Sequence, residues 1–249
     1  MIISHRYRYV FVELPRTGSS AVRRELRELY DGVPVLHKHS TYDEFRRQAS
    51  DAEREYFVFS AIRNPLDDAV SRYFKLKTDH HQRFSDTSRR KPRQPLTSML
   101  DTRMFRYLST TDADFSTFFL HFYKLPFDTW ASLDHRRFDC VMRFERLADD
   151  FDAALRQIGI EPARRLPSRN VTGGRDQNFA TYYSDAARRR AHRVFGPYMR
   201  RWGYEFPPDW DLPAPSAFDE LGYRAYSRLA RVYWMHIRPR TWTGIRPRT

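Results

Sequence analysis

Hydrophobic and polar positions follow two different spacings along this chain, and their alternation predicts a succession of strands and helices. Short apolar runs rich in β-forming residues predict strands at 9–12, 33–36, 56–62 and 138–144. Apolar residues at helical spacing predict helices at 21–30, 42–49, 65–77, 99–107, 115–123, 147–158, 184–199 and 218–235. This order favours an α/β fold in which a parallel sheet carries helices on both faces.

Two polar stretches interrupt these elements. Residues 80–97 are polar, basic and contain proline, which predicts a mobile loop, and residues 164–181 form a second long loop with Gly173-Gly174. We expect one domain over residues 1–212 and a basic, helical C-terminal extension over residues 213–249.

The composition narrows the class of protein. The 249 residues, 41% of them hydrophobic, are enough for one globular core. A net charge of +13 predicts an anionic partner, such as a nucleotide phosphate, an acidic glycan, a nucleic acid or a membrane surface. The single cysteine, Cys140, excludes an intrachain disulfide and a cysteine-based zinc site. No apolar stretch approaches the roughly 20 residues of a membrane span, and Arg6 and Arg8 interrupt any signal-peptide core, so we expect a cytoplasmic protein.

A first candidate phosphate site follows the first predicted strand. Pro15-Arg16-Thr17-Gly18-Ser19-Ser20 forms a turn before a helix, and a helix N-terminus offers unpaired N–H groups and a positive dipole end. Arg16 adds a guanidinium group, Gly18 permits close backbone approach, and the serines add hydroxyl donors. An ordinary turn in which Ser19 caps the helix fits the same residues. The Walker lysine is absent, which argues against a P-loop kinase.

A second candidate phosphate site follows the strand at 56–62. Arg63 ends this strand, Asn64-Pro65 supplies an N-cap and a proline at the first helical position, and Ser71 lies eight positions after Arg63. Ligands of α/β folds bind at the carboxyl ends of parallel strands. For Ser71 alone, a solvent-facing helical serine is the alternative. Together the two sites fit a nucleotide that carries phosphate at both ends.

The two motifs resemble those of the sulfotransferases that use 3′-phosphoadenosine-5′-phosphosulfate (PAPS). Pro15 to Ser20 is similar to the 5′-phosphosulfate loop, and Arg63 with Ser71 is similar to the 3′-phosphate motif. Most of that family has lysine where this chain has Arg16, and arginine holds phosphate without releasing a proton at neutral pH. Weaker similarity continues through residues 143–151, 169–183 and 203–207.

The resemblance implies a sulfotransferase fold with a P-loop-like sheet, PAPS as co-substrate, adenosine 3′,5′-bisphosphate as product, and no metal. It implies the following nucleotide ligands: Arg16, Thr17, Gly18, Ser19, Ser20, Ala21, Arg63, Ser71 and Arg175.

A candidate general base lies in the segment Leu36-His37-Lys38-His39-Ser40. In an extended segment both histidines point to the same side. Paired histidines in a similar setting occur in the heparan-sulfate 2-O type of sulfotransferase, which belongs to sulfotransferase family 2, and this resemblance implies a histidine base. We expect His39 to be the base, with His37 as helper or substitute and Glu13 as a rival; histidines without a chemical role are the alternative. Asp67 and Asp68 are expected in the first turn of their helix as dipole partners.

The acceptor is expected to be a hydroxyl compound, and the positive charge favours a carbohydrate that is already acidic. A kinase with an atypical phosphate loop and a basic nucleic-acid-binding protein are the alternatives, although no nucleic-acid motif is visible. The C-terminal helix carries Arg224, Arg228 and Arg231 and either packs on the domain or touches a membrane or an acidic acceptor. The sequence leaves the oligomeric state open.

Overall fold

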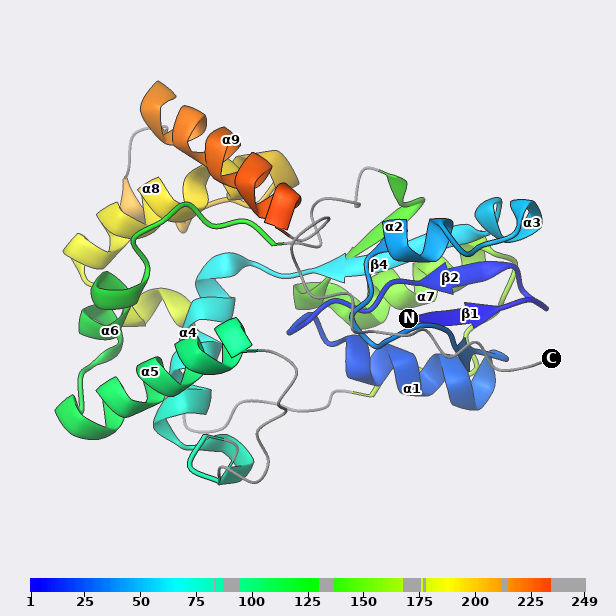
Figure 1. The fold of residues 1–249 in the computed structure, drawn as a ribbon, viewed down its shortest axis with the longest axis horizontal. Coiled ribbons are helices and arrows are strands. Elements are labelled where there is room, and N and C mark those ends of the chain that lie inside the picture. The colour runs from blue at the N-terminus through cyan, green and yellow to red at the C-terminus, as the bar shows by residue number, and fades with distance from the viewer. Residues whose placement is uncertain are drawn as a thin grey trace. The chain divides into compact units, whose positions relative to one another are not determined.

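The computed structural model of the chain describes residues 1–82, 84–86, 95–129, 137–167, 176, 178–211 and 215–233. The chain divides into two compact units that interleave along the sequence (Figure 1). Unit 1 holds the described parts of Met1–Arg63, Asp128–Asn170 and Ser227–Thr249, and unit 2 those of Asn64–Phe127 and Val171–Tyr226. The predicted division at residue 212 stays a prediction.

Unit 1 is built on a five-stranded sheet with the strand order β3-β1-β2-β4-β5. The strands are β1 (Ile2–Ser4), β2 (Tyr9–Phe11), β3 (Val33–Pro34), β4 (Phe57–Ile62) and β5 (Cys140–Arg143). Strands β2, β4 and β5 pair in parallel, as predicted. Strand β1 pairs antiparallel with both β2 and β3, so the prediction of a purely parallel sheet is wrong. The reason is a tight turn between Ser4 and Tyr9, which folds β1 back onto β2.

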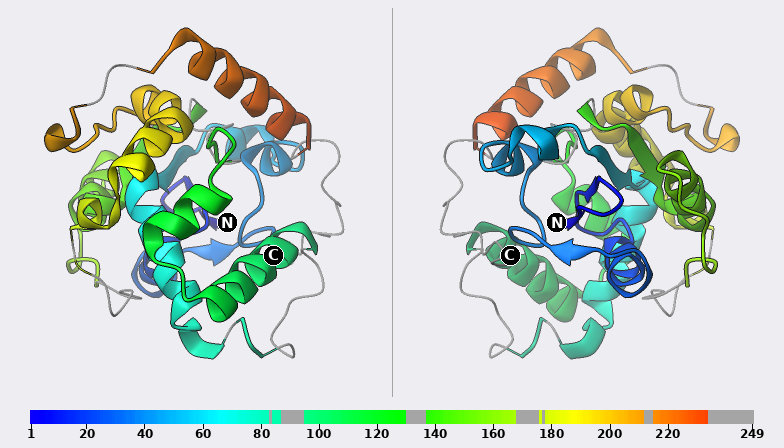
Figure 2. Two further views of the ribbon diagram at one scale, coloured as in Figure 1. Left: turned by 90° about the vertical axis from the view of Figure 1, so that its left-hand side faces the viewer. Right: turned by 90° about the vertical axis from the view of Figure 1, so that its right-hand side faces the viewer.

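Helices cover both faces of this sheet, as predicted (Figure 1 and Figure 2). Helices α1 (Ser19–Leu29) and α7 (Leu147–Gln157) bury Val22, Leu26, Phe151 and Leu155 against one face. Helix α2 (Tyr42–Arg46) covers the other face with Tyr42 and Phe45. The helix predicted over 42–49 is therefore too long, because α2 ends at Arg46. A short helix that was not predicted, α3 (Asp51–Arg54), follows it, and Ser50 opens this helix through a capping box with Glu53.

Unit 2 is helical and its core is aromatic. Its main helices are α4 (Pro65–Lys77), α5 (Pro95–Thr111), α6 (Phe115–Phe122), α8 (Asp185–Trp202) and the first part of α9 (Ala217–Val232), with 3₁₀ turns η1 (His80–Gln82), η6 (Phe179–Tyr182) and η7 (Pro208–Trp210). Tyr73, Phe118, Phe119, Tyr183 and Phe195 pack ring against ring between the helices.

Two predictions about the ends of these helices have clear outcomes. Asn64 caps α4 as expected, because its side-chain oxygen accepts a hydrogen bond of 2.9 Å from Leu66 N–H. Helix α5 begins at Pro95, so the loop predicted over 80–97 is too long at its end, and η1 occupies its start. Residues 83 and 87–94 of that segment lie outside the described residues. Among the helices that the structure describes, none combines the length and the apolar character needed to cross a lipid bilayer.

Candidate functional site

Strands β2 and β4 are parallel neighbours, and they bring the two predicted phosphate turns to the same edge of the sheet. Ser60 in β4 donates a hydrogen bond of 2.7 Å to the carbonyl oxygen of Val12, the residue that follows β2. Beyond the strands, Nη1 of Arg63 donates to the Arg16 carbonyl oxygen at 3.3 Å. The turns that carry Arg16 and Arg63 are therefore in direct contact, as their positions after neighbouring strands predict.

The turn between β2 and α1 is closed around one carbonyl group. The hydroxyl groups of Thr17 and Ser19 both donate to the Leu14 carbonyl oxygen, at 3.1 and 2.8 Å. Ser19 is the first residue of α1 and Gly18 is its N-cap, so the alternative of a Ser19-capped helix is wrong. Gly18 has no side chain, so the N-cap residue supplies no capping acceptor.

The start of α1 therefore keeps the property of an anion-binding helix end. Backbone N–H groups of the first turn have no partner within the helix, and the positive end of the helix dipole lies beside them. Ala21 is one exception among the predicted ligands, because its N–H already bonds to the Gly18 carbonyl oxygen at 2.9 Å. The Arg16 side chain is exposed on this turn, with φ of 67° in its backbone.

Gly18 is required for two physical reasons. Its φ of +74° lies in the left-handed region that disfavours side chains, and a Cβ atom there would lie 2.4 Å from Cδ2 of Leu147. The sequence suggested that Gly18 lets a phosphate approach the backbone. In the structure, the absent side chain also makes room for the side chain of Leu147. Leu147 opens α7, which follows β5 through the 3₁₀ turn η5 (Phe144–Arg146).

Phe144 is a residue of the site that sequence reasoning missed. The Arg63 guanidinium group stacks over its ring at 4.1 Å from the centroid, and Arg63 is only 8% exposed. Such a contact orients the guanidinium plane and reduces the freedom of the side chain. The segment around Phe144 resembled a sulfotransferase segment in the sequence, but its contact with Arg63 depends on the pairing of β4 with β5.

His39 lies beside the end of β2 in a defined protonation state. Its Nδ1 atom is 3.0 Å from the Glu13 carbonyl oxygen, and a carbonyl only accepts, so Nδ1 carries the proton. The lone pair of Nε2 is then available to take a proton. Burial lowers the pKa of His39 below its usual 6.5, against the opposing effect of the bond to Glu13. The imidazole is therefore neutral at pH 7, as a general base must be.

The segment that carries the two histidines is a turn, so the prediction of an extended segment is wrong. Ser40 N–H bonds to the His37 carbonyl oxygen at 3.2 Å, and the Ser40 hydroxyl accepts from His37 N–H at 3.2 Å. This turn removes the argument that His37 and His39 share one side. The role of His37 as helper stays a prediction.

Glu13, the rival base, is fully buried and is bound by two cations. Its Oε2 atom accepts from the Met1 ammonium group at 2.7 Å and from Arg23 at 2.5 Å. A carboxylate in this position serves as the counter-charge of its neighbours, which argues against Glu13 as a base.

Lys38 is a second residue that sequence reasoning treated only as a spacer. Its Nζ atom donates a hydrogen bond of 2.8 Å to the Ser20 hydroxyl oxygen, at the beginning of α1. Residues 20 and 38 belong to different elements, so no local pattern in the sequence connects them.

The remaining predicted ligands are spread over the chain. Ser71 lies on α4 in unit 2 and is 2% exposed, so the alternative of a solvent-facing serine is wrong. Asp67 and Asp68 lie in the first turn of α4, as predicted. Arg175 lies outside the described residues.

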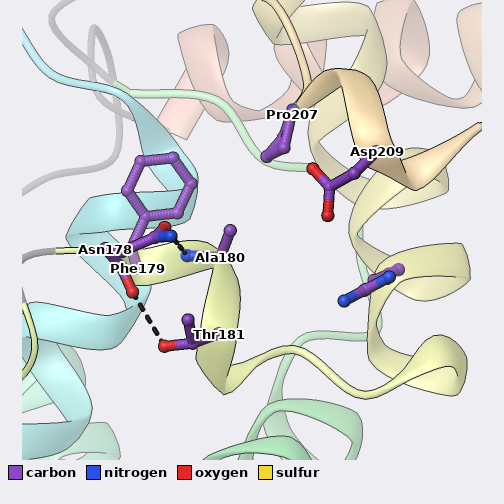
Figure 3. Close-up of a pocket in the computed structure, with 7 residues that line it drawn as sticks. Asn178, Phe179, Ala180, Thr181, Pro207 and Asp209 are labelled. Carbon is purple, nitrogen blue, oxygen red and sulfur yellow. Dashed lines mark hydrogen bonds between the residues drawn. The ribbon is translucent and has the colours of Figure 1, made fainter.

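Within the described residues, no group of three or more His, Cys, Asp or Glu side chains is arranged to hold a metal ion. Unit 2 contains a hollow of about 290 Å³ between η6, α8 and η7 (Figure 3). Its lining consists of Asn178, Phe179, Ala180, Thr181, Arg188, Pro207 and Asp209. None of the predicted site residues lines this hollow.

Comparison with known families gives one decisive match. The sequence model of the sulfotransferase family matches residues 1–205. The chain belongs to the sulfotransferase family. This result confirms the resemblance seen in the two turns, and it makes the transfer of a sulfonate group the reaction class of the protein. Searches among curated proteins and among solved structures give no match to this sulfotransferase.

Proposed function

We propose that this sulfotransferase moves the sulfonate group of PAPS to a hydroxyl group of a carbohydrate and releases adenosine 3′,5′-bisphosphate. The observation that carries this proposal is the hydrogen bond between Arg63 and the Arg16 carbonyl oxygen. It joins two cationic turns at one sheet edge, which suits a nucleotide with phosphate groups at both ends.

The residues of the first turn fit the 5′ end of such a nucleotide. Because Thr17 and Ser19 hold the turn through the Leu14 carbonyl, binding falls to Arg16 and to the backbone N–H groups from Gly18 to Ser20. Arg63, oriented by Phe144, is the proposed ligand of the 3′-phosphate. Ser71 and Arg175 remain proposed ligands on the sequence motif alone.

The proposed reaction is an in-line displacement at sulfur. The acceptor oxygen forms a bond to sulfur while the bond from sulfur to the 5′-phosphate oxygen breaks. The acceptor proton passes to Nε2 of His39, and the electron pair of the broken bond stays on the phosphate. The hydrogen bond from Nδ1 of His39 to the Glu13 carbonyl oxygen supports this step, because it stabilises the imidazolium that forms.

An acidic glycan is the proposed acceptor because the chain carries a net charge of +13. Positive charge concentrates polyanionic substrates near a surface and raises their rate of encounter. Neutral alcohols and peptide hydroxyl groups serve as the contrasting acceptors in the test.

The experiment has a binding part and a transfer part. Calorimetry with adenosine 3′,5′-bisphosphate is compared with ATP and Mg²⁺ and with a short RNA; preferential binding of the bisphosphate is expected. Transfer of labelled sulfonate from PAPS is then measured on heparan sulfate, chondroitin, a phenol and a tyrosine peptide. Preferential binding of ATP would support a kinase, and strongly salt-dependent RNA binding without bisphosphate binding would support a nucleic-acid-binding protein.

Three variants assign the roles within the site. Arg16→Ala is expected to abolish transfer and to weaken binding of the bisphosphate. His39→Ala is expected to abolish transfer while it still binds the bisphosphate. His5→Ala, which changes an exposed histidine bonded to Tyr56, is the matched control and should transfer normally. Full turnover by His39→Ala would move the base to His37 or Glu13.

A further inference from the structure

Lys38 is held next to the start of helix α1 by contacts at several points. Its ammonium group bonds to the hydroxyl of Ser20, the second residue of α1. Its backbone belongs to the turn from His37 to Ser40. The Met1 ammonium group donates to the His37 carbonyl oxygen at 3.0 Å, which ties this turn to β1. The position of the lysine thus follows from the sheet as well as from its own side chain.

Lys38 adds positive charge at the N-terminal end of α1. The carboxylate of Glu13 is already bonded to two cations, and His39 is neutral. Lys38 and Arg16 therefore add positive charge where α1 presents its positive dipole end. An ammonium group is a compact charge with three rotatable donors, so it can follow an oxygen whose charge changes during a reaction.

We propose that Lys38 is a catalytic residue that donates a hydrogen bond to the 5′-phosphate oxygen from which the sulfonate departs. This inference rests on the proposed function. As the sulfur–oxygen bond breaks, its electron pair adds negative charge to that oxygen, and the Lys38 ammonium neutralises the charge while keeping its proton. The acceptor proton goes to His39, so the protons balance. Ser20 holds the ammonium in place before the donor binds.

The test compares Lys38→Ala, Lys38→Arg and the control Arg27→Ala, which removes an exposed cation from the far end of α1. At saturating PAPS, kcat of Lys38→Ala should fall about 100-fold, the usual loss for one donor to a developing oxyanion. Its affinity for adenosine 3′,5′-bisphosphate should change less than about tenfold. Lys38→Arg should recover at least about tenfold of the lost rate, and Arg27→Ala should match the wild type.

A pH profile separates catalysis from a structural role. The positive charge of Lys38 helps to lower the pKa of His39, so the acid limb of kcat should move to higher pH in Lys38→Ala and stay in place in Lys38→Arg. Lys38→Met, which keeps the aliphatic stem, replaces the alanine variant if the latter is unstable. A kcat of Lys38→Ala within twofold of the wild type, or equal losses in the arginine and alanine variants, overturns the assignment. An inactive wild type that does not bind the bisphosphate instead overturns the proposed function.

A second inference concerns helix α9, which exposes several large apolar side chains to solvent. Phe218 is 86% exposed and Leu229 is 70% exposed, and Leu221 and Val232 are exposed as well. Their spacing of three to eight residues places them along one face of the helix. The opposite side is anchored in unit 2, where buried Tyr223 accepts a hydrogen bond from Arg201.

Arginines line one edge of this apolar stripe. Arg224, Arg228 and Arg231 are exposed, and on a helical wheel they lie together beside the stripe. The two acidic residues of the first turn are engaged, since Asp219 bonds to Ser216 and Glu220 pairs with Arg200 at 3.0 Å. An exposed apolar stripe flanked by exposed arginines is complementary to a lipid surface that carries negative headgroups.

We infer that α9 binds the surface of an anionic lipid bilayer through this stripe and its arginines. The full chain is sedimented with vesicles of phosphatidylcholine alone and with vesicles in which phosphatidylcholine is mixed with anionic phosphatidylglycerol. Three arginines predict about 100-fold tighter binding to the anionic vesicles. Leu229→Glu should reduce that binding at least about tenfold, whereas the charge-reversal control Arg193→Glu on α8 should reduce it less than Arg228→Glu.

The contrary outcomes are distinct. Equal binding of Leu229→Glu and wild type, or no binding to anionic vesicles, overturns the inference. A dimer in solution that Leu229→Glu dissociates, without vesicle binding by the wild type, would show that the stripe contacts a second copy of the chain instead.

Discussion

The substitution Gly18→Ala tests whether the turn between β2 and α1 depends on an empty Cβ position. Alanine in the left-handed conformation found here, with φ of +74°, costs roughly 1–2 kcal/mol. The new Cβ would also lie 2.4 Å from Cδ2 of Leu147, about 1 Å closer than an ordinary carbon–carbon contact. Forcing a methyl group into a packed site costs typically about 1–3 kcal/mol. We therefore expect Gly18→Ala to lower the free energy of unfolding by roughly 2–5 kcal/mol.

Gly159 offers a matched control for the backbone contribution. Its φ is +77°, close to that of Gly18, but a Cβ there would meet nothing within 4 Å. Gly159→Ala should therefore cost only the roughly 1–2 kcal/mol of the backbone conformation. The difference between the two variants gives the packing contribution at Gly18.

Urea unfolding followed by tryptophan fluorescence measures both variants, and Leu147→Ala completes a double-mutant cycle with Gly18→Ala. Removing the Leu147 side chain should relieve the packing part of the cost, so a coupling of about 1–3 kcal/mol is expected between the two positions. Equal destabilisation by Gly18→Ala and Gly159→Ala, together with no coupling to Leu147, would refute this reasoning.

Three further predictions concern His39, Phe144 and Cys140. Because burial lowers the pKa of His39 below 6.5, kcat/KM should fall only at pH values below 6.5. The unfolded chain binds this proton at a higher pH than the folded protein does, so the free energy of unfolding should decrease as the pH falls through 6.5. His39→Gln should remove this decrease in urea titrations at pH 5 and 7. An acid limb above pH 7 would contradict the assignment. Phe144→Leu removes a cation–π contact of about 0.5–2 kcal/mol and should weaken binding of adenosine 3′,5′-bisphosphate roughly 2- to 30-fold by calorimetry, whereas unchanged binding would show that Arg63 is oriented by other contacts. Burial raises the pKa of the Cys140 thiol above 9.0, so iodoacetamide at pH 8 should alkylate it at least about tenfold more slowly in the native protein than in urea, and equal rates would exclude a protected thiol.

Local patterns predicted most of the elements because their causes are local. The apolar run before Arg63 forms β4, and Asn64-Pro65 opens α4, since cap and proline act within a few residues. Strand β1 was missed because the three residues Ile2–Ser4 are too few for a periodic pattern, and their pairing depends on β2 and β3.

The candidate site was predictable only in part, for a related reason. The order of the strands places Arg16 and Arg63 at one edge, and the motifs locate both residues in the sequence. Contacts between distant segments, such as Lys38 with Ser20 or Arg63 with Phe144, arise only once the sheet has formed. The turn at His37 to Ser40 was missed because an extended conformation was expected there. Two hydrogen bonds between His37 and Ser40, one through the serine hydroxyl and one between backbone groups, hold the segment in a turn instead.

The orientation of His39 depends on a main-chain oxygen, and this has a consequence for how the protein can diverge. The Glu13 side chain can be exchanged without deleting the acceptor that fixes the imidazole tautomer, since every amino acid at position 13 supplies the same carbonyl group. Relatives with different residues at this position can therefore keep the same proton-accepting nitrogen. Selection on that strand end would then act on the path of the backbone, and sequence identity at position 13 would be a poor guide to shared chemistry.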